Sequence, residues 1–252
     1  MDPSMYRAFA ELHEARHWWF VGRRRIVQSV LASLFGERRD LKILDIGCGT
    51  GGMIPILARH GRVTGIDGAE AAIRYSRERH GGMAELRQVD FPREMPPGGE
   101  YDLVTLFDVL EHLDDDATAL RRAASLAREG GRLIVTVPAY RFLWSPHDEI
   151  NQHRRRYSPR ELRDRILSAG LALRRLSHFN TLLFPIVYAA RVVRRSRVRT
   201  GDQRSDFRVG QRWLNALLAD VFGVERFLLR RMDLPFGVSL LAVAERPTRG
   251  RA

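Results

Sequence analysis

Short apolar runs of strand length recur along the chain and alternate with stretches of mixed polarity. The first run covers Leu41 to Ile46, and further strands are predicted at Val63–Asp67, at the more polar segment Leu86–Phe91 and from Tyr101. Apolar runs without polar alternation are typical of strands that are covered on both faces. Further elements are predicted as a helix at Ala117–Arg128 and strands at Gly130–Pro138, Leu171–Phe179 and Gly237–Glu245.

A glycine-rich turn follows the first strand. Asp45 lies near the carboxyl end of that strand, and Gly47, Gly49 and Gly51 come directly after it. Glycine permits backbone conformations and close approaches that a β-carbon would block. Because open parallel sheets bind ligands at the carboxyl ends of their strands, the turn predicts a nucleotide pocket. Gly52 also completes a GxGxxG pattern, so this loop alone would suit NAD equally well.

Acidic residues end the next strands as well. Asp67 follows the second strand about twenty residues after the loop, at the position that reaches ribose hydroxyls. Asp90 and Phe91 end the third strand, and the fourth leads into the acidic segment FDVLEH. These residues should therefore meet at one edge of the sheet.

The motifs DIGCGTG, GID, VDF and FDVLEH, in this order and spacing, resemble those of the class I S-adenosylmethionine-dependent methyltransferases. The resemblance covers Leu41 to Pro138. It implies an α/β fold with a Rossmann-like, seven-stranded, mostly parallel sheet and helices on both faces. The cofactor would be S-adenosylmethionine (SAM). The resemblance implies these contacts: Asp45, Gly47, Cys48, Gly49 and Gly51 near the methionine portion, Asp67 with Gly68 at the ribose, Asp90 and Phe91 at the adenine, Asp108 and Val109 on the methionine side, and Glu111 and His112 toward the acceptor.

The segment before the first strand is predicted to be a helical lid, residues 1–36, on a methyltransferase domain at 37–252. In the family this region often covers the acceptor. Trp18, Trp19 and Phe20 would then close the pocket, Arg23 and Arg24 would lie at its rim, and Gly22 would act as a hinge. Closure of a lid excludes water from the reaction. Alternatively, the aromatic residues dock the helix on the sheet while the arginines face solvent.

A dense polar segment, Ala139 to Pro159, follows the fifth strand and should overhang the same pocket. It is the main candidate for the acceptor site, and a solvated loop is the alternative. His147, His153 or His112 would accept a proton. A metal site from His147, Asp148 and His153 is the weaker interpretation, because the spacing matches no recurring ligand pattern, and no metal is predicted. The remaining candidate acceptor contacts are Tyr140, Trp144, Asp148, Arg154, Arg155 and Tyr157.

More than fifty residues, 180–233, separate the last two predicted strands and form a helical insertion. The segment TLLFPIVYAARVVRRSRVR opens with thirteen mostly apolar residues, too few to span a bilayer, and ends in dense arginine. Peripheral membrane contact is one interpretation, and a substrate roof or dimer surface is the slightly favoured one. The chain is expected to be a monomer or homodimer.

The formal net charge is +12, and nearly all of it comes from arginine, since Lys42 is the only lysine. Arginine pairs well with phosphate and carboxylate oxygens. The favoured acceptor is thus a small acidic or phosphorylated molecule, with a prenyl diphosphate or another isoprenoid or lipid-linked intermediate as the specific candidate. Whether the methyl group goes to oxygen, nitrogen or carbon stays open.

Two other functions compete with this interpretation. An RNA methyltransferase would use the positive charge, but Phe107 to Leu110 do not form the Asn-Pro-Pro-Tyr-like turn of base-amine methylation. A non-catalytic cofactor-binding protein would not need the polar segment. Cys48 is the only cysteine, which excludes a disulfide within the monomer. Charges throughout the amino terminus argue against a signal peptide, so a cytoplasmic enzyme is expected.

Overall fold

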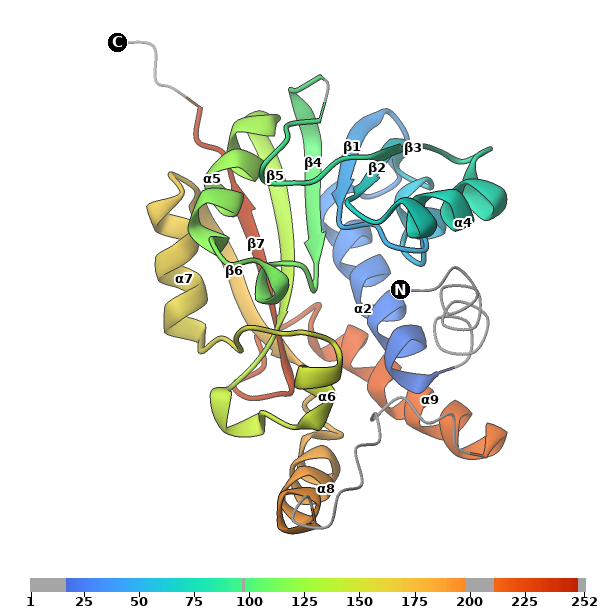
Figure 1. Ribbon diagram of the computed structural model, residues 1–252, viewed down its shortest axis with the longest axis vertical. Coiled ribbons are helices and arrows are strands. Elements are labelled where there is room, and N and C mark those ends of the chain that lie inside the picture. The colour runs from blue at the N-terminus through green and yellow to red at the C-terminus, as the bar shows by residue number, and fades with distance from the viewer. Residues whose placement is uncertain (1–16, 97, 198–210, 249–252) are drawn as a thin grey trace.

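A computed structural model describes residues 17–96, 98–197 and 211–248. Seven strands form one sheet in the order β3-β2-β1-β4-β5-β7-β6 (Figure 1). Neighbouring strands are parallel except at β7, which runs antiparallel to both β5 and β6. The strands are β1 (Leu41–Ile46), β2 (Gly61–Asp67), β3 (Ala84–Gln88), β4 (Tyr101–Phe107), β5 (Ala127–Pro138), β6 (Ala172–Phe179) and β7 (Ser239–Glu245).

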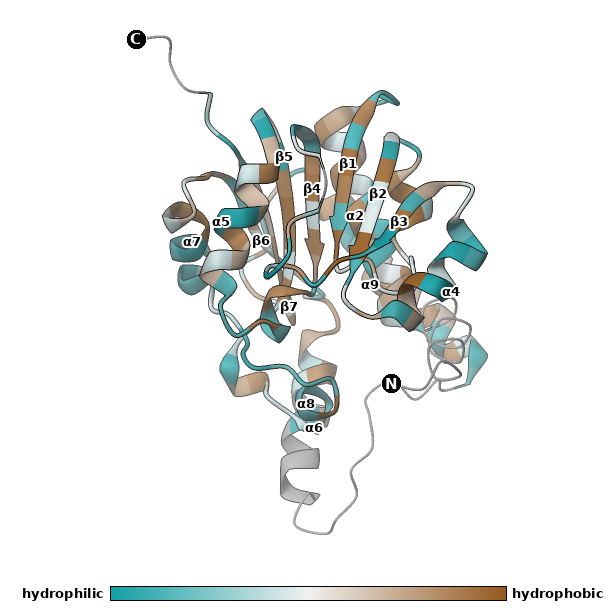
Figure 2. Ribbon diagram, turned by 45° about the horizontal axis from the view of Figure 1, so that its top comes forward, coloured by the Kyte–Doolittle hydropathy of each residue, from teal (hydrophilic) through white to brown (hydrophobic). Residues whose placement is uncertain are grey.

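The predicted Rossmann-like sheet is confirmed. Two boundaries differ: β3 ends at Gln88, three residues before Phe91, and β5 begins at Ala127, inside the region predicted to be helical. At the first of these, Val89 N donates to the carbonyl oxygen of Asp67 at 3.0 Å, and because Asp67 is the last residue of β2, no partner strand continues beyond this point. Figure 2 shows apolar residues along the central strands, as expected for a sheet covered on both faces.

Helices connect the strands and cover the sheet. The helical elements are α2 (Trp18–Phe35), α3 (Ile54–Leu57), α4 (Glu70–His80), η2 (Leu110–His112), α5 (Asp116–Leu126), η3 (Arg141–Leu143), α6 (Pro146–Ile150), α7 (Pro159–Ser168), α8 (Phe184–Arg197) and α9 (Arg212–Leu228). The helix α7 starts at a capping box in which Ser158 and Glu161 bond each other's backbone N–H groups. In Figure 1, α6 and α8 lie beyond the carboxyl ends of the central strands.

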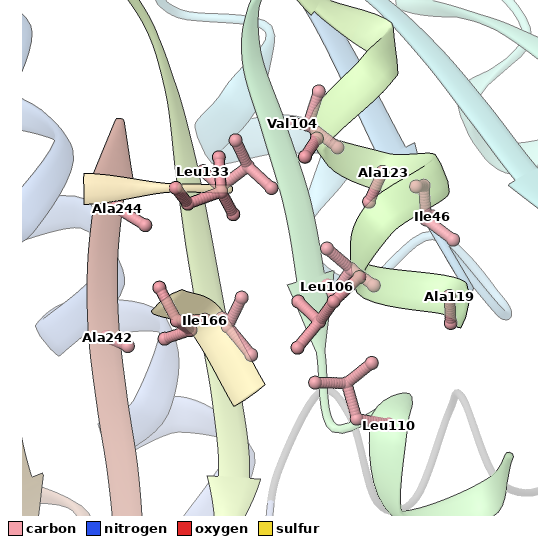
Figure 3. Packing of buried hydrophobic residues seen from close by; sticks show 14 of the residues in the cluster. Ile46, Val104, Leu106, Leu110, Ala119, Ala123, Leu133, Ile166, Ala242 and Ala244 are labelled. Atoms are coloured by element: carbon pink, nitrogen blue, oxygen red, sulfur yellow. The ribbon is translucent and has the colours of Figure 1, made fainter. Parts of the chain in front are cut away.

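The helices α5 and α7 pack on one face of the sheet (Figure 3). Ala119 and Ala123 are fully buried, and their small side chains let α5 approach Ile46 and Leu106 closely. Ile166 brings α7 against Ala242 of β7. Close packing of this kind positions the loop after β4, which leads into α5.

The helices α2 and α9 pack together on the opposite face, and Gly22 lies at their contact. A β-carbon on Gly22 would stand 2.1 Å from Cδ1 of Phe222. The helix α2 runs without a break from Trp18 to Phe35, so the prediction of a hinge at Gly22 is wrong. Glycine is required there because the ring of Phe222 occupies the space of a side chain.

The insertion between β6 and β7 is helical, as predicted, and supplies α8 and α9. Residues 1–16 of the predicted lid and residues 198–210 of the insertion fall outside the described residues. Among the described residues, no helix combines the length and the apolar character needed to cross a bilayer.

Candidate active site

A cavity of about 730 Å³ opens at the carboxyl ends of β1, β2 and β4. The strand order reverses direction between β1 and β4, because β2 and β3 extend to one side and β5 to the other. Open α/β sheets bind ligands at such a point. Side chains of α2, α8 and α9 also line the cavity, which places the predicted lid and the insertion around one site.

The glycine turn forms the floor of this cavity. Gly47, Gly49 and Gly51 have φ angles of 69°, 54° and 87°, in the left-handed region that favours glycine. A β-carbon on Gly47 would also lie 2.5 Å from Cγ2 of Val109. The turn can thus pass close to a ligand and pack against the loop after β4 at the same time.

Asp45 is buried at the end of β1 and accepts a hydrogen bond from Thr105 Oγ1 at 2.7 Å. Burial raises the pKa of Asp45 to about 7, although the Thr105 hydroxyl and the Arg23 guanidinium favour its ionised form. A buried carboxylate that is only partly compensated attracts a cationic group.

Asp67 holds the glycine turn in place. Its carboxylate accepts hydrogen bonds from Gly49 N and Ala69 N, each at 2.9 Å, and burial raises its pKa. Asp90 and the ring of Phe91 lie at the next strand exit and line the same cavity. Acidic groups from three successive strands therefore face one space, next to a flat aromatic ring.

Arg23 connects α2 to the loop after β4. Its guanidinium forms an ion pair with Asp108 and lies over the ring of Trp19, 4.5 Å from the ring centroid. Asp108 has a φ of 56°, and its other oxygen accepts a hydrogen bond from Thr136 Oγ1 at 3.1 Å. Arg23 thus ties the aromatic end of α2, which carries Trp19, to Asp108 in the loop after β4.

Glu111, His112 and His153 gather at one end of the cavity, and one potential ligand atom from each lies within 4.8 Å of the others. Both carboxylate oxygens of Glu111 are buried and lack a hydrogen-bond partner among the described residues. Burial raises the pKa of Glu111 well above its usual value, and the charge of Asp108 adds to this. Burial and the neighbouring His153 lower the pKa of His112 to about 4, so its imidazole is neutral at pH 7.

Asp148 fixes the orientation of His153. Its carboxylate accepts hydrogen bonds from His153 Nδ1 at 2.9 Å, Arg156 Nε at 2.8 Å and Ser145 N at 2.9 Å. The hydrogen bond from His153 and the charge of Arg156 keep the pKa of Asp148 low despite burial. Since an ionised carboxylate only accepts hydrogen bonds, His153 Nδ1 carries the proton that it donates, and Nε2 is the ring nitrogen that is turned away from Asp148.

Eight of the predicted site residues lie outside the lining of the cavity. Arg154 and Arg155 bond the backbone carbonyls of His112 and Leu113 and pair with Asp114 and Asp116. These two arginines hold the loop after β4 instead of facing the cavity, because the loops after β4 and β5 pack side by side. The other six are Gly51, Arg24, Tyr140, Trp144, Asp148 and Tyr157, of which Asp148 acts through His153 and Tyr157 donates a hydrogen bond to Asp116.

The remaining predicted residues line the cavity: Asp45, Gly47, Cys48, Gly49, Asp67, Gly68, Asp90, Phe91, Asp108 and Val109 on the cofactor side, and Trp18, Trp19, Arg23, Glu111, His112, His147 and His153 on the acceptor side. Five residues of the insertion also line the cavity and were not predicted from the sequence: Asn180, Ile186, Val187, Arg191 and Leu218. The amphipathic spacing of the insertion indicated helices, but not which side chains turn toward the pocket.

A comparison with family models matches residues 16–176 to a methyltransferase domain. The chain belongs to this methyltransferase family. Curated relatives include the ubiquinone biosynthesis O-methyltransferase of Bordetella bronchiseptica (strain RB50), which is 38% identical over 138 residues, 52% of either chain. The corresponding enzyme of Pseudomonas aeruginosa is 37% identical over 102 residues, 38% of this chain and 43% of that protein. The chain thus spans about half the length of the curated relatives that it matches.

Solved structures share the fold at lower identity. Magnesium protoporphyrin IX methyltransferase from Synechocystis PCC 6803 with bound SAM has a TM-score of 0.54 and 19% identity, over 90% of this chain and 81% of that one. Geranyl diphosphate C-methyltransferase from Streptomyces coelicolor A3(2) has a TM-score of 0.55 and 16% identity, over 87% of this chain and 79% of that one. These structures show the fold that the methyltransferase domain adopts, and SAM is the cofactor bound in the first of them. The cavity suits that cofactor, because its glycine floor, acidic strand ends and Phe91 ring offer space, hydrogen-bond acceptors and a stacking face.

Proposed function

We propose that this methyltransferase transfers a methyl group to a hydroxyl oxygen of a small acceptor with an apolar, isoprenoid-like body. The observation that carries the proposal is the contrast between the two acceptor-side walls of the cavity. One wall is apolar and combines Trp18 and Trp19 of α2 with Ile186 and Leu218 of the insertion. The other is the cluster of Glu111, His112 and His153.

The residues of the cavity divide the work of the reaction. When bound, SAM supplies a methyl group that its sulfonium already activates. Asp45, Asp67 and Asp90 would bind and orient the cofactor, while the two walls align the acceptor and exclude water. The cluster of Glu111, His112 and His153 would hold the hydroxyl oxygen and receive its proton. Asp148 would keep the His153 imidazole in one orientation.

Similarity to the curated relatives supports oxygen as the methylated atom, since their names describe O-methyltransferases of ubiquinone biosynthesis. A prenyl diphosphate receives less support. Its predicted arginine ligands, Arg154 and Arg155, bond the loop after β4. Of the lining arginines, Arg23 and Arg156 pair with Asp108 and Asp148, and Arg191 donates a hydrogen bond to the carbonyl oxygen of Leu143. We therefore favour a neutral or weakly acidic hydroxyl acceptor over a diphosphate.

The proposal is tested by measuring S-adenosylhomocysteine formation with catechols that carry short or long isoprenoid tails, and with geranyl diphosphate. We expect turnover of the catechols, with the specificity constant rising as the tail lengthens. Replacement of Trp19 by Ala should raise the Michaelis constant of the long-tailed catechol more than that of the short one. Turnover of geranyl diphosphate alone would refute hydroxyl methylation.

We also propose that the insertion meets an anionic bilayer, from which an apolar acceptor would be drawn. Trp213, Leu217 and Phe227 share one side of α9 and are exposed, Trp213 by 65%. Arg230 and Arg231 follow at the end of this helix and are exposed as well. Apolar side chains flanked by arginine bind at the surface of anionic membranes.

Vesicle co-sedimentation tests this contact. Vesicles with phosphatidylglycerol should retain the protein, and replacement of Trp213 and Leu217 by Ser should release it, whereas pure phosphatidylcholine should retain little. Equal retention of the wild type and the double variant would refute a role for α9.

A further inference from the structure

The cluster at the polar end of the cavity has the composition of a metal site. Glu111 and His112 come from η2, and His153 comes from the loop after α6. The three potential ligand atoms lie within 4.8 Å of one another. Ligands of one ion at about 2.1 Å are about 3 to 3.5 Å apart, so small rotations of the side chains would close the site.

Glu111 gives independent support for a missing ligand. Its side chain is fully buried, and neither carboxylate oxygen has a hydrogen-bond partner among the described residues. Leaving a buried polar group unpaired costs about 1 to 3 kcal/mol. The backbone nevertheless holds Glu111 in this position, since Arg154 N donates to its carbonyl oxygen at 2.7 Å. A cation between Glu111 and the imidazoles would satisfy the carboxylate.

The surroundings of His153 also fit a metal ligand. Metal-binding imidazoles usually donate their second N–H to a carboxylate or carbonyl, which fixes the tautomer and aims the other nitrogen at the ion. His153 Nδ1 donates to Asp148, which Arg156 and Ser145 hold in turn. His112 lies next to His153, with ring centroids 4.8 Å apart. The free Nε2 of His153 therefore lies on the side of the ring away from Asp148.

We propose that Glu111, His112 and His153 bind a divalent transition metal ion of the zinc type. Two imidazoles and one carboxylate suit Zn²⁺, Co²⁺ or Fe²⁺ better than Mg²⁺, which prefers oxygen ligands. Three protein ligands leave a coordination position open toward the cavity, as in catalytic zinc sites. No metal was predicted from the sequence, where the weaker alternative combined His153 with His147 and Asp148 in place of Glu111 and His112.

The ion would serve the proposed hydroxyl methylation, and this part of the inference rests on that function. The acceptor oxygen would take the open position, and coordination would lower the pKa of its hydroxyl. With the cluster occupied as ligands of the ion, the O–H proton passes to water as the oxygen coordinates, before methyl transfer, and not to Glu111 or the histidines. The oxygen then bonds the methyl carbon as the carbon–sulfur bond breaks, and sulfur keeps the electron pair.

Direct metal titration tests the site without an activity measurement. The full chain, freed of metal with a chelator, is titrated with Co²⁺ while its visible absorption is recorded, and Zn²⁺ is then added as a competitor. We expect one Co²⁺ per chain, displaced by Zn²⁺. Glu111→Gln, His112→Gln and His153→Gln should each weaken binding at least about tenfold, and Asp148→Asn should weaken it about 10- to 100-fold.

His60→Gln is the matched control, since His60 packs beside Phe35 and lies outside the lining of the cavity. It should bind Co²⁺ like the wild type. Circular dichroism checks that each variant is folded. If a histidine variant does not fold, the metal affinity of Glu111→Gln, which keeps the side-chain volume, decides whether the cluster binds the ion. Absence of stoichiometric binding, or equal binding by wild type and Glu111→Gln, would overturn the metal site.

The outcome separates this inference from the proposed function. Hydroxyl methylation that persists in chelator, together with no Co²⁺ binding, would refute the metal and leave the function in place. Co²⁺ binding by the cluster without methylation of any hydroxyl acceptor would support the metal site and refute the proposed function.

Discussion

Replacement of Thr105 by Val should change the pH dependence of cofactor binding. Thr105 is fully buried, and its hydroxyl donates to Asp45 at 2.7 Å. Valine has nearly the same shape but no donor, so the variant removes the hydrogen bond to Asp45, together with a longer one to the carbonyl oxygen of Leu44 at 3.3 Å, and little packing. A hydrogen bond to a charged group contributes about 1.5 to 3 kcal/mol, which corresponds to a rise of about 1 to 2 in the pKa of Asp45.

The direction of the effect follows from the charges. The pKa of Asp45 lies at about 7, raised by burial, so the carboxylate form dominates above pH 7 and the neutral form below it. SAM carries a positive sulfonium and should bind the carboxylate form better. Affinity should therefore rise with pH and level off above pH 7, and in Thr105→Val the rise should be displaced to about pH 8 to 9.

Calorimetric titration with SAM between about pH 5.5 and 9.5 covers both transitions. At pH 7 the variant should bind about tenfold more weakly than the wild type, and the two should converge at the alkaline end. Thr105→Ser keeps the hydroxyl and is the matched control. The rise of its SAM affinity with pH should have the same midpoint as that of the wild type. An unchanged midpoint in Thr105→Val would refute the role of this hydrogen bond, and pH-independent binding by all three proteins would refute the role of Asp45.

Two further variants test the lid and the acceptor end. Gly22→Ala should destabilise the protein by about 1 to 3 kcal/mol, because the new methyl group overlaps the ring of Phe222. The melting temperature should therefore fall by roughly 2 to 10 °C. Gly82→Ala, where a methyl group meets open space, should stay within about 0.5 kcal/mol of the wild type, and equal melting temperatures for both variants would contradict the packing argument. Asp148→Asn should lower kcat about 10- to 100-fold at unchanged SAM affinity, because His153 loses its orienting carboxylate, and an unchanged kcat would remove that pair from the mechanism.

The sheet and the cofactor side were predictable because their signals are local. The central strands are short apolar runs. Asp45, Asp67 and Asp90 each lie at or just after the carboxyl end of a strand, where the parallel topology brings them together. A backbone that must turn through left-handed conformations requires glycine, and the Gly47–Gly51 spacing shows this directly.

The acceptor side was less predictable because its residues meet only through tertiary packing. Arg154 and Arg155 looked like ligands for an anion, but the loop after β4 lies beside them and takes their hydrogen bonds. Gly22 looked like a hinge, although the ring that requires it, Phe222, is 200 residues away in the sequence. The unpaired carboxylate of Glu111 is a property of burial, which composition and spacing do not reveal.

The fate of the methyl group tests the central claim most directly. The protein would be incubated with SAM labelled with carbon-13 in the methyl group and with an isoprenoid-tailed catechol, and the product examined by nuclear magnetic resonance. The account predicts a single labelled signal at the chemical shift of a methyl ether. A labelled methyl group on carbon, or label that stays on SAM in the presence of every hydroxyl acceptor tried, would contradict it.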